Sequence, residues 1–195
     1  MGERKFLYGM IASMLCWGVS WPIGKILSGY GAAEGLAFLR FGLTFISLLF
    51  ILVIVKGKVS LSKKVIPKLL VASCIMTLYG YLFLKGLSYG KAGAGGVLVT
   101  TLNPILTYAL TMFISFRTPS TKETIGLLMG LMAGFILLKI WENSDTIFDI
   151  GNSYFVLATD LWAVLSKVTA SSSKYGSSVV FSLLMYAICT LMMLC

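Results

Sequence analysis

The sequence predicts an all-α membrane protein that crosses the bilayer several times. Hydrophobic residues make up 58% of the 195 positions and charged residues only 12%, which leaves too few polar side chains to cover a water-soluble surface. The apolar residues fall into segments close to the roughly 17 to 25 residues that a helix needs to cross a bilayer. Lysine and arginine gather in the short breaks between these segments. These observations together predict a polytopic bundle of transmembrane helices.

Charges and helix breakers divide the chain into seven apolar segments, and we predict one transmembrane helix for each. The segments cover residues 6–27, 35–55, 69–87, 92–116, 121–140, 152–170 and 176–195. The third and the fifth are short between their flanking lysines. Seven crossings would place the two ends of the chain on opposite sides of the membrane.

Basic residues are distributed unequally between the two sides. If the N-terminus is cytoplasmic, eleven Lys and Arg residues flank the inner ends of the segments and four flank the outer ends. The positive-inside rule therefore predicts a cytoplasmic N-terminus, a cytoplasmic loop over residues 56–68 and an external C-terminus. The same distribution accounts for the net charge of +9, so we expect the lipid bilayer as a partner and no nucleic acid.

The sequence lacks the residues that metal, redox and nucleotide sites require. It contains no histidine, and its four cysteines lie in apolar segments without a CxxC spacing, so neither a metal site nor a disulfide framework is indicated. The GAGG run at residues 93–96 is not followed by Lys-Ser or Lys-Thr, which favours close helix contact over phosphate binding. We expect no cofactor and no enzymatic activity, because no nucleophile stands with a base.

A shift of the sequence by 145 residues superimposes related residues of two helices. The matched pairs are Trp17 with Trp162, Gly18 with Ala163, Val19 with Val164, Phe41 with Tyr186 and Gly42 with Ala187. Five helices between equivalent positions would invert the second copy relative to the first. We therefore predict a first five-helix repeat over residues 1–145 and two helices of a second, incomplete repeat over residues 146–195.

A second repeat equal to the first would need about three more helices. We accordingly expect these 195 residues to be a fragment of a longer carrier that does not transport alone. A homodimer, in which a second copy supplies the missing wall, is the alternative.

Several motifs occur in an order that resembles a known family. They are the run WGVSWPIGK at 17–25, LRF at 39–41, LKGLSYGKA at 84–92, the Asn103-Pro104 pair, and the glycines at 126, 130 and 134. This order resembles the EamA-type carriers of the drug/metabolite transporter superfamily, and the resemblance extends over the whole chain. It implies ten transmembrane helices in two inverted five-helix repeats around a central cavity. It also implies export of metabolites or amino acids, and we expect a bacterial inner membrane location.

The chain departs from the family pattern at one position. Many members carry a glutamate about nine residues before the first glycine of the fifth helix, where this sequence has Arg117. The nearest acidic residue is Glu123. The role of that glutamate cannot be transferred to this chain.

Two prolines inside predicted spans indicate where a cavity would form. Pro22 leaves the carbonyl of Gly18 without its helical partner, and Pro104 does the same to Thr100. We expect the two broken helices to line a substrate path, although packing kinks satisfied by threonine hydroxyls are the alternative. The predicted cavity residues, which are aromatic or neutral and polar around these breaks, are Trp17, Ser20, Trp21, Pro22, Thr100, Thr101, Asn103, Pro104, Tyr108 and Trp162.

Two charged residues lie inside predicted spans. Arg40 is about 9 Å into the second helix and Asp160 about 13 Å into the sixth, counted from the same side. Charges inside a bilayer tend to face the protein interior and to pair. We predict that Arg40 and Asp160 face one cavity as a charge pair, with Asp160 as the candidate proton-coupling group. A purely structural pair, or partners in further helices, is the alternative.

A secondary transporter of small metabolites, working by alternating access, is the function that these features favour. The absence of a nucleotide-binding motif from the sequence makes an ion or substrate gradient the expected driving force. A non-transporting assembly or sensor protein of the membrane is the alternative function.

Overall fold

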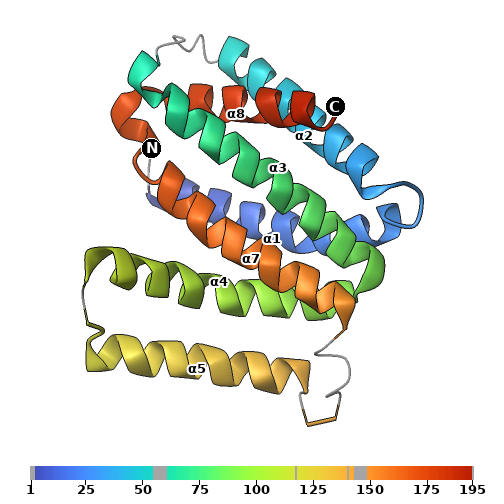
Figure 1. The fold of residues 1–195 in the computed structure, drawn as a ribbon, viewed down its shortest axis with the longest axis vertical. Helices are drawn as coiled ribbons and strands as arrows, with labels where there is room; N and C mark the ends of the chain where they lie inside the picture. The colour runs from blue at the N-terminus through green and yellow to red at the C-terminus, as the bar shows by residue number, and fades with distance from the viewer. Residues whose placement is uncertain (1–2, 55–60, 117, 140, 143–148, 195) are drawn as a thin grey trace.

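The computed structural model of the protein describes residues 3–54, 61–116, 118–139, 141–142 and 149–194. These residues form seven α-helices, two 3-10 helices and, instead of a sheet, one isolated β-bridge (Figure 1). The elements are α1 (Glu3–Leu27), α2 (Ala33–Ile54), η1 (Lys63–Val65), α3 (Ile66–Tyr89), α4 (Ala92–Ser115), α5 (Thr121–Leu138), α7 (Ile150–Thr169), η2 (Ser172–Tyr175) and α8 (Ser178–Met192). Each α-helix coincides with a predicted segment, and their ends differ by only a few residues. Residues 56–60, Arg117 and the predicted repeat boundary at 145 lie outside the described residues.

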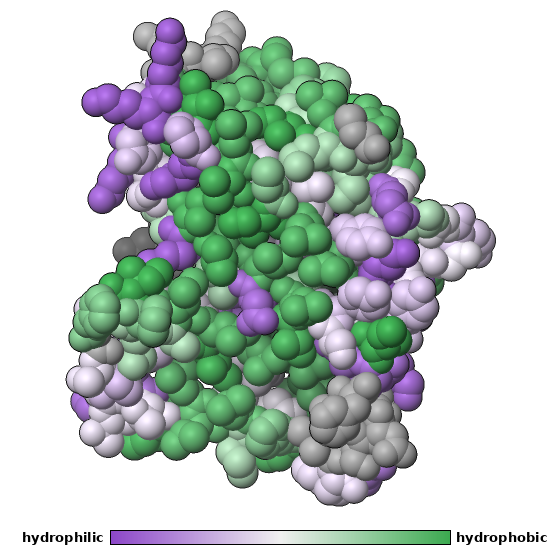
Figure 2. Space-filling model, viewed as in Figure 1, coloured by the Kyte–Doolittle hydropathy of each residue, from purple (hydrophilic) through white to green (hydrophobic). Residues whose placement is uncertain are grey.

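The long helices and the surface fit a bilayer. Five helical stretches are long and apolar enough to cross a membrane: Phe6–Leu27, Ala33–Ile54, Lys63–Tyr89, Ala92–Ser115 and Thr121–Leu138. Figure 2 shows a broad hydrophobic band over the visible face, with hydrophilic side chains gathered mainly toward two opposite edges. Of the other two helices, α7 carries Asp160, Lys167 and several uncharged polar residues, which the bilayer disfavours, and α8 is only 15 residues long.

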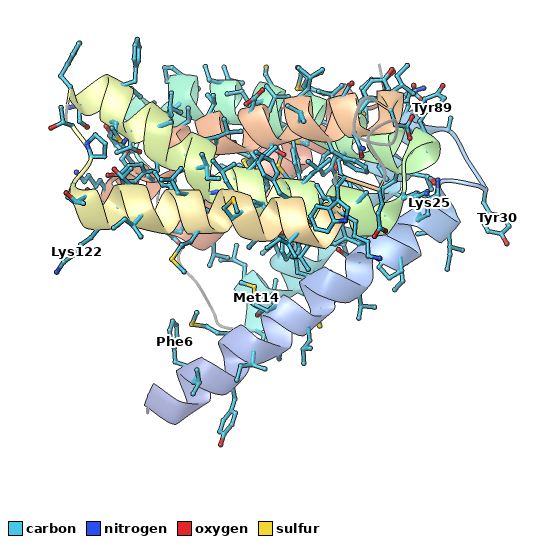
Figure 3. All side chains as sticks on the ribbon, turned by 90° about the horizontal axis from the view of Figure 1, so that it is seen from below. Phe6, Met14, Lys25, Tyr30, Tyr89 and Lys122 are labelled. Atoms are coloured by element: carbon cyan, nitrogen blue, oxygen red, sulfur yellow. The ribbon has the colours of Figure 1, made fainter. Side chains whose placement is uncertain are left out.

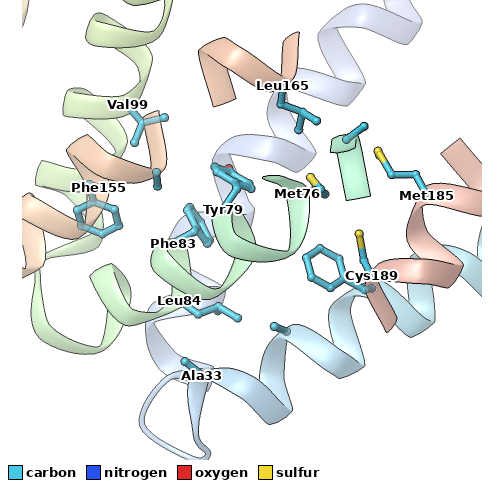
Figure 4. Close-up of a cluster of buried hydrophobic side chains, with 14 of the residues drawn as sticks. Ala33, Met76, Tyr79, Phe83, Leu84, Val99, Phe155, Leu165, Met185 and Cys189 are labelled. Atoms are coloured by element: carbon cyan, nitrogen blue, oxygen red, sulfur yellow. The ribbon is translucent and has the colours of Figure 1, made fainter. Parts of the chain in front are cut away.

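The third helix is the centre of the bundle. It contacts α1, α2, α4, α7 and α8, while α7 also packs along α4 and α2 packs along α8. The buried side chains of α3 and its neighbours form one apolar core, part of which Figure 4 shows. The fifth helix lies at the edge of the bundle and packs against α4 (Figure 1).

Glycines allow α7 to approach α3 and α4 closely. The Phe155 ring on α7 is fully buried and lies against Gly86 of α3, against Gly95 of α4, and against Gly90 between these helices. A Cβ atom added at Gly86 would come within 2.7 Å of this ring. Gly151 meets the backbone at Gly90 in the same region. We call Gly86, Gly90 and Gly95 the glycine socket of Phe155.

The first helix is attached to the bundle only over its second half. Every side chain from Phe6 to Ser20 is exposed, and Figure 3 shows this half of α1 diverging from the other helices. From Phe6 onward, Trp21 is the first buried side chain of α1, and Gly24 approaches Leu87 of α3. The attachment therefore begins at the WPIGK sequence that also contains the proline.

The predicted breaks at the two prolines are not formed. Pro22 lies inside α1 and Pro104 inside α4, and both helices continue through them. A proline removes one backbone hydrogen bond, and that loss does not end a helix whose other bonds remain. Near Pro104, the Thr100 hydroxyl donates to the carbonyls of Gly96 and Val97 at 2.8 and 3.1 Å. The expectation of two broken helices was therefore wrong.

Polar contacts join two connections at the end of the bundle that we predict to be cytoplasmic. The Ser62 amide donates to the Tyr175 carbonyl at 2.9 Å, and Leu61 forms the β-bridge with Gly176. The Lys68 ammonium group donates to the Ser171 hydroxyl at 2.6 Å. These bonds fix the α2–α3 connection against the α7–α8 connection.

Candidate functional site

A groove between α1 and α4 contains four of the predicted cavity residues. Its volume is about 510 Å³. Trp17, Trp21 and Pro22 line it from α1, and Thr100 lines it from α4. We call it the α1/α4 groove. Its remaining lining residues are small or aliphatic: Gly18, Ala92, Gly93, Gly96 and Val97.

Glycines keep this groove open and tryptophans give it aromatic walls. A Cβ atom added at Gly18 or Gly93 would meet nothing within 4 Å, whereas one at Gly96 would contact the Trp21 ring at 3.6 Å. The rings of Trp17 and Trp21 stand edge to face, with centroids 6.3 Å apart. Gly95 and Gly96 of the GAGG run therefore serve close contact with aromatic rings, as the sequence indicated, whereas Gly93 faces open space.

Few polar groups line the α1/α4 groove. The Thr100 hydroxyl hydrogen is used within its own helix, so its oxygen is left to accept a hydrogen bond from a solute. Flat aromatic faces with few polar groups are typical of sites for small organic molecules. The groove therefore suits an organic solute better than a bare ion.

An aromatic cluster connects the α1/α4 groove to Trp162. Trp21 contacts Phe83 at a centroid distance of 4.9 Å, Phe83 contacts Tyr79 at 5.9 Å, and Tyr79 contacts Trp162 at 4.8 Å. Figure 4 shows Tyr79 and Phe83 in the centre of the bundle. Trp162 itself lines a different cavity of about 260 Å³ among α3, α7, α8 and η2. It lies behind the groove and does not form part of its wall.

The other predicted cavity residues on α4 do not line the α1/α4 groove. Thr101 faces α5, where a Cβ atom added at Gly134 would lie 2.7 Å from its methyl group. Asn103 accepts a hydrogen bond from Thr107 at 3.2 Å. Pro104 is exposed, and the next turn carries the partly buried Tyr108. A helix presents only part of its circumference to one neighbour, so α4 divides this set between several surroundings.

Ser20 lies on the opposite side of α1. It lines a second groove, between α1, α2 and α3, that has a volume of about 540 Å³. Its hydroxyl donates to the Trp17 carbonyl at 2.6 Å. Arg40 of α2 lines the same groove, which we call the Arg40 groove.

The structure does not bring Arg40 and Asp160 together. The Arg40 guanidinium carbon lies 4.9 Å from the centroid of the Phe83 ring, and its charge interacts with the hydroxyl groups of Tyr79 and Tyr186. Asp160 is exposed on α7, which packs against α3 and α4. Within the described part of the chain, the ion pairs join Lys85 to Glu34 and Lys139 to Glu142. Similar depth did not predict proximity, because depth leaves the direction around each helix undetermined.

Sequence reasoning missed the role of Lys25. Its ammonium group donates to the Leu87 carbonyl at 2.7 Å and to the Ser88 carbonyl at 3.2 Å (labelled in Figure 3). These carbonyls belong to the last turn of α3, which leaves carbonyl groups without helical partners. The basic residue at the end of the first span was a detectable signal, but its partner could not be read from the sequence.

Within the described residues, no group of three or more His, Cys, Asp or Glu side chains gathers as a metal site would require.

Comparison with known proteins gives one family match. No curated protein and no solved structure matches the chain. Residues 5–139, which include helices α1 to α5 almost entirely and the α1/α4 groove, match the EamA-like transporter family. The chain thus belongs to the EamA-like transporter family, a family of membrane transporters.

Proposed function

We propose that the protein is a secondary transporter that carries small metabolites or amino acids across a membrane by alternating access, most simply as an exporter. Two observations support the proposal: the membership of the family and the α1/α4 groove with its aromatic walls. The groove carries the proposal, because four of the predicted cavity residues line it, from two helices that are long and apolar enough to cross a membrane.

Filling the groove without disturbing the fold tests this proposal. Gly18→Leu and Gly93→Leu each place a side chain in open space of the groove, since a Cβ atom there meets nothing within 4 Å. Gly130→Leu is the matched control, because Gly130 is equally open but lies on α5 outside the groove. The assay is efflux of pooled radiolabelled amino acids and metabolites from proteoliposomes.

We expect the 195 residues to transport only as the homodimer that completes the cavity wall. Where the wild type shows efflux, both groove variants should lose it while Gly130→Leu keeps it. All three variants should retain the unfolding temperature of the wild type in detergent, because none creates a clash. Full efflux by Gly18→Leu and Gly93→Leu would exclude this groove from the path. No efflux by folded wild-type protein with any solute would agree with our expectation that these 195 residues do not transport alone, and it would equally fit the alternative, a non-transporting assembly or sensor protein.

Asp160 is our candidate for coupling transport to a proton gradient. Asp160 is exposed on α7 and lies ten positions after the first residue of that helix, Ile150. The sequence contains no nucleotide-binding motif, so an ion gradient is an expected driving force. Asp160→Asn removes the titrating group and keeps the shape of the side chain. We expect this variant to lose the dependence of efflux on an imposed pH gradient. An unchanged dependence would assign coupling to another group or to the substrate gradient.

The two-repeat organisation supplies the mechanism that we propose. Residues 1–145 would form one five-helix repeat and residues 146–195 the first two helices of an inverted second repeat. The 145-residue offset pairs α1 with α7 and α2 with α8, and α2 packs along α8 as a pair near a two-fold axis would. Rocking of one repeat against the other would expose the substrate path to each side in turn. Homodimer formation stays a prediction, which native mass spectrometry of the purified protein checks.

A further inference from the structure

The Arg40 groove has apolar walls and a single cationic group. Leucines at positions 39, 43 and 84 supply aliphatic wall, and Phe83 closes the side toward the bundle. Ser20 is the one hydroxyl-bearing residue in the lining, and its hydrogen is committed to the Trp17 carbonyl. Arg40 is therefore the group that could donate strong hydrogen bonds to a molecule in this groove.

The guanidinium group is held at depth and does not reach back to the membrane surface. Arg40 follows the first residue of α2, Ala33, by seven positions, or about 10 Å. Its guanidinium lies over Phe83, which is six positions before the end of α3 at Tyr89 on the same side. It also interacts with Tyr79, one turn deeper. A cation at this depth is costly unless a protein group or a bound anion compensates it.

No acidic side chain compensates Arg40 among the residues that the structure describes. The nearest elements are α2, α3, α8 and α1, and the ion pairs of the described chain involve Lys85 with Glu34 and Lys139 with Glu142. Aromatic faces and phenol groups surround the guanidinium instead. They lower the free-energy cost of holding a cation within the bilayer, but they do not neutralise its charge. The charge remains available to an anion that enters the groove.

We propose that the Arg40 groove binds an organic anion with an apolar body, and that Arg40 binds its carboxylate. This inference rests on the proposed transport function and names the class of substrate. A planar guanidinium matches a carboxylate in a bidentate pair, and the leucine walls match an aliphatic or aromatic body. A zwitterion fits less well, because no acidic residue among those that the structure describes lines the groove to bind an ammonium group. A lipid headgroup stays at the interface, about 10 Å above this level.

One layer of aromatic rings separates the Arg40 groove from the α1/α4 groove. Trp21 lines the α1/α4 groove, Phe83 lines the Arg40 groove, and their rings are in edge-to-face contact at 4.9 Å. A solute held by Arg40 would therefore lie one aromatic layer away from the α1/α4 groove.

The test uses three probes with the same phenyl body. Phenylacetate carries a carboxylate, phenylacetamide is its neutral amide, and phenethylamine carries an ammonium group. Binding of each radiolabelled probe is measured on the purified protein in nanodiscs of neutral phosphatidylcholine. The variants are Arg40→Gln and Arg40→Lys, and Lys91→Gln is the matched control, because Lys91 is an exposed cation that does not line the groove.

We expect the wild type to bind phenylacetate at least about tenfold tighter than phenylacetamide. The reason is that a hydrogen bond to a charged group contributes enough binding free energy to change the affinity by this factor. Arg40→Gln should remove this preference, Arg40→Lys should keep part of it, and Lys91→Gln should keep all of it. The inference is overturned if the wild type shows no preference for the carboxylate, or if Arg40→Gln leaves the preference unchanged.

A measurement on the wild type covers the case in which the Arg40 variants do not fold. Phenylglyoxal modifies accessible arginines, and mass spectrometry quantifies the modification at Arg40. Phenylacetate should protect Arg40 and phenylacetamide should not; equal protection contradicts the inference. If anionic phosphatidylglycerol in the nanodiscs protects Arg40 and phenylacetate does not, the groove is a lipid site and the inference fails.

These results separate the inference from the proposed function. Arg40-dependent binding of phenylacetate without any efflux would leave the inference standing and give no support to transport by these 195 residues. Efflux of other solutes by a protein that does not prefer carboxylates would support transport and overturn the inference.

Discussion

The rings of Phe41 and Tyr186 lie against each other, with centroids 6.0 Å apart and planes tilted by 43°. Phe41 is on α2 and Tyr186 is on α8, and the offset of 145 residues that relates the two halves of the sequence places one on the other. A residue meets its own equivalent only close to the axis that relates two copies. The contact is therefore what a pseudo-two-fold axis between α2 and α8 would produce.

We expect Phe41 and Tyr186 to be energetically coupled. A double-mutant cycle of Phe41→Leu and Tyr186→Leu tests this coupling. The loss of unfolding free energy in the double variant should differ from the sum of the two single losses by about 0.5–1.5 kcal/mol, the contribution of an aromatic pair. Reversible unfolding in mixed micelles measures each free energy. Phe41→Leu combined with Phe135→Leu on the exposed side of α5 is the control pair and should be additive. Additivity of the first pair would contradict the coupling.

Removing Phe155 should strongly destabilise the bundle. The ring fills the glycine socket between α3 and α4, so Phe155→Ala leaves a cavity that the backbone cannot close, at a cost of about 3–5 kcal/mol. Phe113→Ala is the control, because the Phe113 side chain is 79% exposed and its loss leaves no cavity. Equal unfolding temperatures of the two variants would show that the socket does not hold α7.

Two glycines of the motif at residues 126, 130 and 134 should respond differently to the same substitution. Gly134 faces Thr101 of α4, so Gly134→Leu forces a clash and should cost about 1–3 kcal/mol. Gly130 lies one turn earlier on α5 and has nothing within 4 Å, so Gly130→Leu should be neutral or slightly stabilising. Thermal unfolding of the two variants measures the difference. A destabilised Gly130→Leu would indicate a contact of α5 with another molecule.

Helix positions could be predicted from the sequence because the bilayer imposes a length on each apolar segment. The capping box of Ser120 and Glu123, in which the Ser120 amide donates to the Glu123 carboxylate at 2.8 Å, fixes the start of α5 at the predicted residue. The structure also brings Trp17, Trp21 and Thr100 into one groove. The two tryptophans share a face of α1 because they are four positions apart.

Contacts between helices could not be predicted to the same extent. In a membrane, lipid tails are as apolar as the protein interior, so hydrophobicity does not tell which side of a helix meets a neighbour. The sequence indicated that Arg40 and Asp160 share a depth, but their faces follow from the packing of α2 on α8 and of α7 on α4. For the same reason, the sequence could not indicate that Thr101 faces α5 and that Trp162 lines a separate cavity.

Lys25 should stabilise the attachment of α1. Lys25→Met removes the two hydrogen bonds to the last turn of α3 while keeping an apolar stem, and should cost about 1.5–3 kcal/mol, as for hydrogen bonds to charged groups. Lys91→Met is the control on the same side of the membrane, since Lys91 is exposed at the start of α4. Proteolysis within the α1–α2 connection should become faster in Lys25→Met only. Equal proteolysis rates in both variants would argue against a stabilising role of the Lys25 hydrogen bonds.

The orientation of the protein is testable at two positions on opposite sides. We predict that Lys64, in η1 just before α3, is cytoplasmic and that Tyr30, between α1 and α2, is external, because basic residues concentrate at the ends on the Lys64 side. Tyr30 is 85% exposed, so a cysteine there is accessible to a reagent in water. In a background without the native cysteines, a membrane-impermeant maleimide added to intact cells should label Tyr30→Cys readily and Lys64→Cys only after permeabilisation. Labelling of Lys64→Cys alone in intact cells would invert the topology, and the predicted external face of the Arg40 groove would then be cytoplasmic.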